Sequence, residues 1–164
     1  MAITRVEPGP GQESVWDYPR PPRLEHVSEL VEVELGGTVI CSTRRSLRVL
    51  ETSHPPTYYL PFADFTPGSV RPADGSSYCE WKGEAAYLDL LGGDRIAFGK
   101  AWHYPEPTRP FLDIRGHLAL YPAEMDECRV DGEVVRPQEG GFYGGWITSR
   151  VVGPFKGPPG SRSW

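Results

Sequence analysis

The chain has 164 residues, of which 38% are hydrophobic and 24% charged, a composition typical of one globular domain. Its formal net charge is −5 and no run of lysine and arginine exceeds two residues, which argues against nucleic acid as a partner. No apolar segment has the length of a signal-peptide core or a membrane span, so we expect a cytoplasmic protein without a membrane partner.

Cysteine and histidine show no metal-ligand spacing. The three cysteines, Cys41, Cys79 and Cys128, are widely separated and form no C-x-x-C pair, which fits reduced thiols. Structural zinc sites use paired cysteine or histidine ligands, and the four histidines do not supply such pairs either. We therefore expect no zinc or other metal, and no bound cofactor.

Glycine and proline concentrate at both ends of the chain and otherwise lie between apolar runs. This distribution predicts turns inside the chain and loose or wrapping ends. We expect a single domain with an N-terminal extension at residues 1–27 and a core at residues 28–135. Residues 136–164 are expected to form a strap of glycine and aromatic residues packed on that core.

The first strong secondary-structure pattern lies at residues 30–43. Valine and leucine alternate there with glutamate before the glycine pair at 36–37, which predicts a β-hairpin with one solvated face. Residues 45–51 follow it. They also alternate apolar and charged side chains, so we predict a further strand there rather than a helix.

Two more hairpins follow along the chain. Residues 85–104 reverse at the glycine pair 92–93, and residues 128–135 reverse at Asp131-Gly132, a dipeptide favoured by the type I′ turn. Helical signal is weak and is confined to one short turn within residues 107–117. The predicted fold class is all-β, mainly antiparallel, with at most one short helix.

Several motifs occur in an order and spacing that resemble one known family. From about residue 28 to 135 the chain is similar to the family called domain of unknown function 427. Its C-terminal run GGFYGGWITSRVVGPFKG resembles an extended form known from bacterial, specifically actinobacterial, proteins. The motifs that carry the resemblance are YYLP (58–61), YCEWKGEAAY (78–87), AWHYPEP (101–107) and IRGHLALYP (114–122).

The resemblance implies a β-tent fold, as in methionine sulfoxide reductase B and the thalidomide-binding domain of cereblon. Many β-tents carry zinc on two C-x-x-C knuckles, which this chain lacks. The family also carries a nucleotidyltransferase label. The chain has neither a glycine-serine turn followed by paired aspartates nor a phosphate loop, and the glycine pair between Asp89 and Asp94 is interpreted as a hairpin tip.

Aromatic residues with polar tips are the strongest functional signal. Such rings are typical of a pocket that stacks on a flat ligand, although for any one of them a place in the core is an equally good interpretation. An arginine beside such a pocket would suit an anionic ligand. By analogy with other β-tents, the pocket is expected on the sheet face bearing Trp81 and Trp102. The predicted ligand-binding residues are Arg45, Tyr58, Trp81, Tyr87, Trp102 and Tyr104.

Cys79, Lys82 and His54 are the candidates for catalysis. A thiol, an amine and an imidazole could act as nucleophile or as acid and base, although a buried cysteine beside a tryptophan is more often inert. Strand alternation places Cys79 and Lys82 on opposite faces unless a bulge or the turn at Gly83 intervenes.

Three functions remain open from the sequence. The first is a module that binds a small planar ligand, for which an anion is one option. The second is a cofactor-independent enzyme that uses Cys79, Lys82 or His54. The third is an interaction protein, a homodimer for example, that uses its aromatic surface; the C-terminal strap could close a pocket, cover an edge strand or form that contact.

Overall fold

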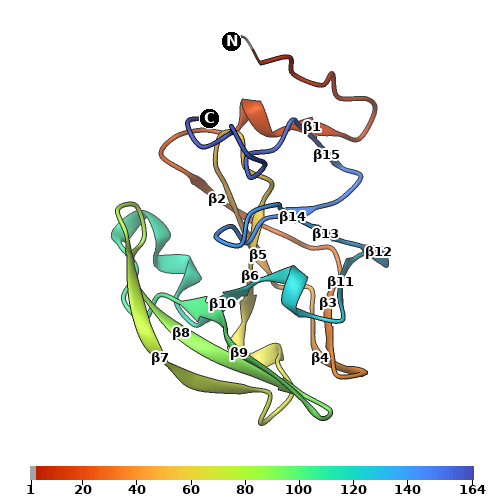
Figure 1. The fold of residues 1–164 in the computed structure, drawn as a ribbon. Helices are drawn as coiled ribbons and strands as arrows, with labels where there is room; N and C mark the ends of the chain where they lie inside the picture. The colour runs from red at the N-terminus through yellow and green to blue at the C-terminus, as the bar shows by residue number, and fades with distance from the viewer. Residues whose placement is uncertain (1–2) are drawn as a thin grey trace.

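The computed structural model describes residues 3–164, and these form an all-β, mainly antiparallel structure (Figure 1). The larger sheet has seven strands, in the spatial order β2 (Arg23–His26), β5 (Leu47–Leu50), β6 (Thr57–Pro61), β10 (His117–Leu120), β9 (Arg95–His103), β8 (Gly83–Gly92) and β7 (Val70–Cys79). The second sheet has the order β12 (Glu133–Val134), β11 (Glu127–Val130), β3 (Val31–Leu35) and β4 (Thr38–Thr43).

Short elements complete the fold. Two small sheets join β1 (Glu13–Ser14) to β15 (Val151–Val152) in parallel and β13 (Arg136–Pro137) to β14 (Trp146–Ile147) in antiparallel orientation. The helical segments are 3-10 turns: η1 (Val15–Asp17), η2 (Phe62–Asp64), η3 (Arg109–Ile114) and η4 (Pro122–Glu124). No helix within residues 3–164 combines the length and apolar character that crossing a membrane requires.

The predicted hairpins are confirmed by strand pairing. β3 pairs with β4 around residues 36–37, and β8 pairs with β9 around residues 93–94, one residue later than predicted. β11 pairs with β12 around Asp131 and Gly132, whose φ angles of 47° and 81° are those of a type I′ turn. Residues 45–51 contain β5, and residues 107–117 contain η3, the longest of the 3-10 segments.

The ends of the chain belong to the sheets more than the predicted boundaries suggest. β2 lies within the predicted N-terminal extension, yet it pairs with β5 and forms one edge of the seven-stranded sheet. β1 pairs with β15, so the two ends of the chain lie side by side at one pole of the molecule (Figure 1).

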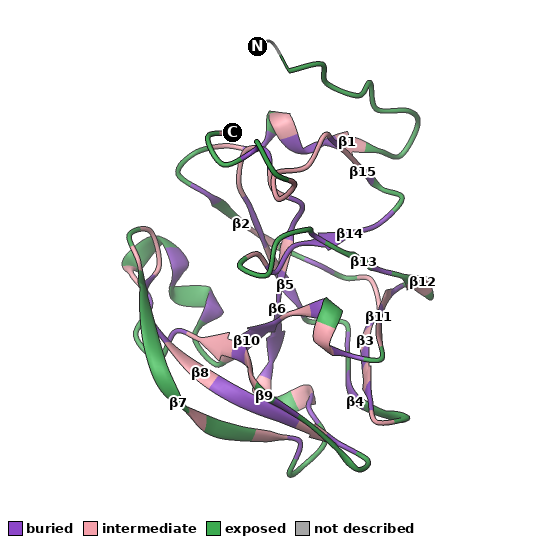
Figure 2. Cartoon of the chain, viewed as in Figure 1, coloured by how far each residue is buried: buried purple, intermediate pink, exposed green. Residues whose placement is uncertain are grey.

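The seven-stranded sheet is packed on both faces. One face meets the four-stranded sheet through a core that includes Leu35, Leu60 and Leu118 (Figure 2). The opposite face packs under η3, through Phe111 and Ile114. We call this second face the η3 face; it carries Leu47, Val49, Tyr59, Trp102 and Ala119.

Candidate functional site

A cavity of about 440 Å³ opens on the η3 face. Rings from four strands of the sheet, from the residues that follow β9 and β10 and from the C-terminal strap surround it, so we call it the aromatic cavity. Its seven aromatic lining residues with polar tips are Tyr59, Tyr78, Tyr87, Trp102, Tyr104, Tyr121 and Tyr143.

Strand register explains why these rings meet. Tyr87 of β8 lies directly opposite Trp102 of β9, and paired residues in neighbouring strands project to the same face. Trp102 also contacts Tyr121, with ring centroids 4.8 Å apart. Tyr59 and Tyr104 are almost completely buried and form the floor, whereas Tyr87 and Trp102 are half-buried and form the walls.

The C-terminal strap covers part of the cavity. Gly144 lies so close to Trp102 that a Cβ atom at this position would be 2.5 Å from the ring carbon Cη2. Gln138 fastens the strap, because its Oε1 accepts from the Gly145 N–H at 3.1 Å and its own N–H donates to the Gly145 carbonyl at 3.0 Å. A glycine is therefore needed where the strap crosses the tryptophan ring.

Two lysines bring positive charge into the cavity. The ammonium of Lys82 lies 5.7 Å from the ring centroid of Tyr104 and 5.9 Å from that of Phe111. The ammonium of Lys156 lies 6.0 Å from the Tyr143 ring. Neither lysine pairs with an aspartate or glutamate side chain in the described part of the chain, although Lys156 Nζ donates to the main-chain oxygen of Trp164 at 3.3 Å. Glu51, the acidic residue that lines the cavity, is paired with Arg20 at 3.3 Å.

His54 lies under the strap in its neutral form. Gln138 Oε1 accepts from Gly145, so the amide nitrogen of Gln138 is the atom that faces His54 Nδ1, at 3.2 Å. An amide nitrogen can only donate, so His54 Nδ1 accepts, and the proton of the neutral imidazole is on His54 Nε2. The pKa of His54 is lowered to about 4, chiefly by desolvation on burial; the positive charges of Lys156, Arg20 and Lys82 contribute to the lowering, and the negative charge of Glu51 opposes it.

The first prediction concerns this imidazole. Proton NMR of the His54 ring is expected to show a titration midpoint near pH 4 instead of the ordinary 6.5. Since the folded pKa lies below the unfolded one, the unfolded state takes up the proton first, and stability falls as pH drops from about 6.5 towards 4. His54→Gln should lose less stability across that interval; a midpoint above 6 would contradict the buried neutral assignment.

The structure brings the three catalytic candidates together with half of the predicted binding residues. Cys79, Lys82 and His54 line the aromatic cavity with Tyr87, Trp102 and Tyr104. Cys79 ends β7, and a turn at residues 80–82 precedes β8, so alternation is interrupted between Cys79 and Lys82. The intervening turn is therefore the reason that both can reach one cavity.

The other three predicted binding residues lie elsewhere. Tyr58 projects to the opposite face of the sheet from Tyr59 and stacks on Trp146, with ring centroids 4.7 Å apart. Trp81 packs against the cluster under η3 without lining the cavity. Arg45 forms an ion pair of 2.6 Å with Asp64.

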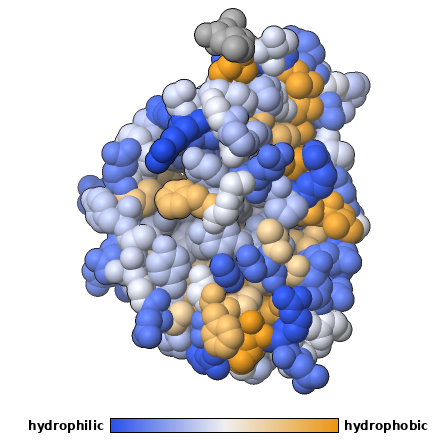
Figure 3. All heavy atoms as spheres, in the orientation of Figure 1, coloured by the Kyte–Doolittle hydropathy of each residue, from blue (hydrophilic) through white to orange (hydrophobic). Residues whose placement is uncertain are grey.

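Sequence reasoning did not assign Gln138, Tyr143 or Lys156 to the site, and the strap supplies all three. The paired glycines that flank Phe142 and Tyr143 were the available signal, but they did not show which surface the strap would cover. Trp146 is completely buried and so presents no surface for an oligomer contact. On the face drawn in Figure 3, apolar residues form separate patches within a mostly hydrophilic surface.

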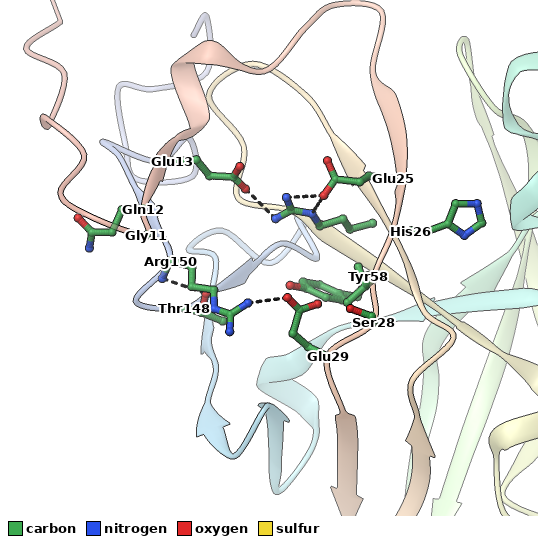
Figure 4. Close-up of a pocket in the computed structure, with 12 residues that line it drawn as sticks. Gly11, Gln12, Glu13, Glu25, His26, Ser28, Glu29, Tyr58, Thr148 and Arg150 are labelled. Carbon is green, nitrogen blue, oxygen red and sulfur yellow. Dashed lines mark hydrogen bonds and ion pairs between the residues drawn. The ribbon is translucent and has the colours of Figure 1, made fainter.

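A second, polar cavity of about 320 Å³ lies between the N-terminal and C-terminal segments (Figure 4). Its charged side chains pair with one another. Arg48 lies 2.7 Å from Glu13 and 2.6 Å from Glu25, and Arg150 lies 2.6 Å from Glu29. These pairs join the ends of the chain to the sheet, so we assign this cavity a structural role.

The two aspartates near the β8–β9 tip have different surroundings. Asp89 is engaged by Arg71 at 2.9 Å and by the Gly99 N–H at 2.7 Å, whereas Asp94 is exposed at the hairpin tip. Within residues 3–164 no three histidine, cysteine, aspartate or glutamate side chains are placed to hold a metal ion.

Comparison with known proteins gave one family match. The model of a family labelled NTP_transf_9 and described as Domain of unknown function (DUF427) matches residues 23–131. The matched range includes the walls and floor of the aromatic cavity but ends before the strap. No curated protein matched the chain.

Proposed function

Since the chain belongs to the DUF427 family, as its motifs indicated, and this description leaves the activity open, we propose from the site itself that the protein binds a small, planar, anionic molecule in the aromatic cavity. One observation carries the proposal: two lysine ammonium groups, neither of them paired with an aspartate or glutamate side chain in the described residues, lie against aromatic rings inside one cavity. The three cysteines are free thiols, which supports the cytoplasmic location that belongs to the same proposal.

Each part of the cavity favours one property of the ligand. Its aromatic walls and floor favour a flat apolar body, because stacking and burial of ring surface are its main source of binding free energy. Lys82 and Lys156 favour a negative charge, since a carboxylate or phosphate would complete their electrostatic pairing. A volume of about 440 Å³ is within the range of ordinary small-molecule sites.

An enzyme that acts on the same ligand is the second candidate, because Cys79 and Lys82 line the cavity together. His54 is a poor general base at neutral pH, since its Nδ1 already accepts a hydrogen bond and its pKa is about 4. Binding therefore has more support than catalysis. Native mass spectrometry of the purified protein separates the two, because a released molecule supports binding, whereas a mass retained on Cys79 or Lys82 after denaturation supports covalent chemistry.

The second prediction tests the charge preference by calorimetry with 2-naphthoate and its neutral analogue 2-naphthamide. Lys82→Met and Lys156→Met are each expected to weaken naphthoate binding about fivefold, which corresponds to roughly 1 kcal/mol for a partly solvated charge pair. Binding of the amide should not change.

Lys100→Met is the matched control, because Lys100 lies outside the aromatic cavity and faces Glu124 at 3.8 Å. If the wild-type protein binds the acid and the amide with equal affinity, the claim that the cavity prefers an anionic ligand is wrong. If neither compound binds and no molecule co-purifies with the protein, the claim that the cavity binds a planar ligand is wrong as well.

A further inference from the structure

A third cavity, of about 630 Å³, lies beside the aromatic cavity along the same two strands. β5 and β6 contribute Val49 and Tyr59 to the aromatic cavity, and Leu47 and Pro61 to this one. Because residues two apart in a strand project to one face, both cavities open on the η3 face. We call the third cavity the basic cleft; besides Leu47 and Pro61, the residues that matter here are His26, Arg44, Ser46 and His117.

Two histidines flank the apolar floor of the basic cleft. His26 of β2 lies opposite Leu47, and His117 of β10 lies opposite Pro61, so all four side chains share the η3 face. His117 Nδ1 lies 3.1 Å from the Arg115 carbonyl oxygen and donates to it. In the neutral ring, Nε2 is therefore the nitrogen left for a ligand.

The two arginines of the cleft differ in their pairing. Arg45 is held by Asp64 through two hydrogen bonds of 2.6 and 3.2 Å. Arg44 makes only a 3.4 Å contact with the Ser28 carbonyl and pairs with no carboxylate in the described part of the chain. Asp113, the acidic residue that lines the cleft, is exposed. The Arg44 guanidinium therefore has donors available for an anion.

Ser46 supplies an independent sign that the cleft takes a ligand. Its side chain is 1% exposed, and its hydroxyl is buried with no hydrogen-bond partner within residues 3–164. A buried hydroxyl without a partner is destabilising unless something supplies one. Ser46 lines the cleft, so this residue borders the space that an occupant would fill.

We infer that the basic cleft is a second binding site, distinct from the aromatic cavity, for a phosphate group. The planar fork of Arg44 matches phosphate geometry, and the Ser46 hydroxyl would gain its missing partner if its side chain turned towards the cleft. Leu47 and Pro61 provide an apolar floor for the organic part of a phosphomonoester, so the monoester should bind more tightly than free phosphate.

Titration with inorganic phosphate and with phenyl phosphate, at pH 7 and constant ionic strength, tests this inference by amide NMR. Saturable shifts are expected at Ser46 and His117, with phenyl phosphate at least threefold tighter than phosphate. Arg44→Gln should weaken both about tenfold, and Ser46→Ala about threefold. Arg109→Gln, an exposed change on η3 outside the cleft, should leave both affinities unchanged.

Either of two results would overturn the inference: shifts that stay linear and spread over all basic residues, or equal affinities in Arg44→Gln and Arg109→Gln. Tighter binding of free phosphate than of phenyl phosphate would contradict the claim that Leu47 and Pro61 bind the organic part of the ligand. Lys82→Met tests the basic cleft independently of the aromatic cavity. This change should leave phosphate binding in the basic cleft unaltered, and that result is expected even if the aromatic cavity is found to bind no ligand.

Discussion

Replacing Trp102 by alanine is expected to weaken 2-naphthoate binding about 30-fold, the largest effect of any single change in the aromatic cavity. Trp102 contacts Tyr121, stands opposite Tyr87 and meets the strap at Gly144. Truncation therefore removes a stacking surface and one support of the cavity roof. Central tryptophans in binding sites commonly contribute about 2 kcal/mol, which corresponds to that fold-change, and calorimetry measures it directly.

Two further variants distinguish the loss of ring stacking from other causes of weaker binding. Trp102→Phe keeps a ring and should restore most of the affinity, provided that circular dichroism shows an intact fold for both variants. Cys79→Ser should change the affinity less than threefold, because a site that works by stacking does not need the thiol. A larger loss in Cys79→Ser than in Trp102→Ala would favour thiol chemistry and the enzyme candidate.

Gly36→Ala is expected to lower the free energy of unfolding by about 2–4 kcal/mol. Gly36 is at the tip of the β3–β4 hairpin, and a Cβ atom there would overlap the carbonyl oxygen of Gly92 in β8. The backbone φ of 62° adds a further cost for any residue with a side chain. Since the contact joins the four-stranded sheet to the seven-stranded sheet, urea denaturation should show a lower midpoint.

Gly37→Ala is the matched control. Gly37 has a similar φ of 75°, but an added Cβ would have no neighbour within 4 Å. This variant should cost only about 1 kcal/mol, from the backbone conformation alone. Equal destabilisation by the two substitutions would show that the contact between the hairpin tips is not what holds the sheets together.

Local patterns predicted the hairpins well because their signals are contained in a few neighbouring residues. Alternation over residues 31–35 and the Asp131-Gly132 pair each specify a local conformation, and both were found as predicted. β7 was predicted only at its end, because the strand expected around Cys79 was extended to Lys82, whereas residues 80–82 form a turn. It contains Pro72, Asp74 and Gly75, residues that are rare in strands, and it forms because β8 offers a long edge on which a bulge between Pro72 and Ser76 is tolerated.

In the candidate site, too, local patterns predicted some features and missed those that depend on distant parts of the chain. Alternation continued from β9 to the next residue groups Trp102 with Tyr104, and both line the aromatic cavity. It could not place Cys79 beside Lys82, since the turn that breaks the alternation begins after β7. Arg45 was expected at the aromatic cavity, but its position depends on Asp64, which comes from a different part of the chain.

The sequence by itself determined the all-β class, the hairpins and the family, because each depends on short-range periodicity, turn chemistry or an ordered set of motifs. Only the tertiary structure decided which rings share a cavity, that the strap roofs it with Gly144 against Trp102, and that two lysine ammonium groups lie there against aromatic rings. These features depend on strand order and on contacts between residues far apart in the chain, such as His54 with Gln138, which no local pattern encodes.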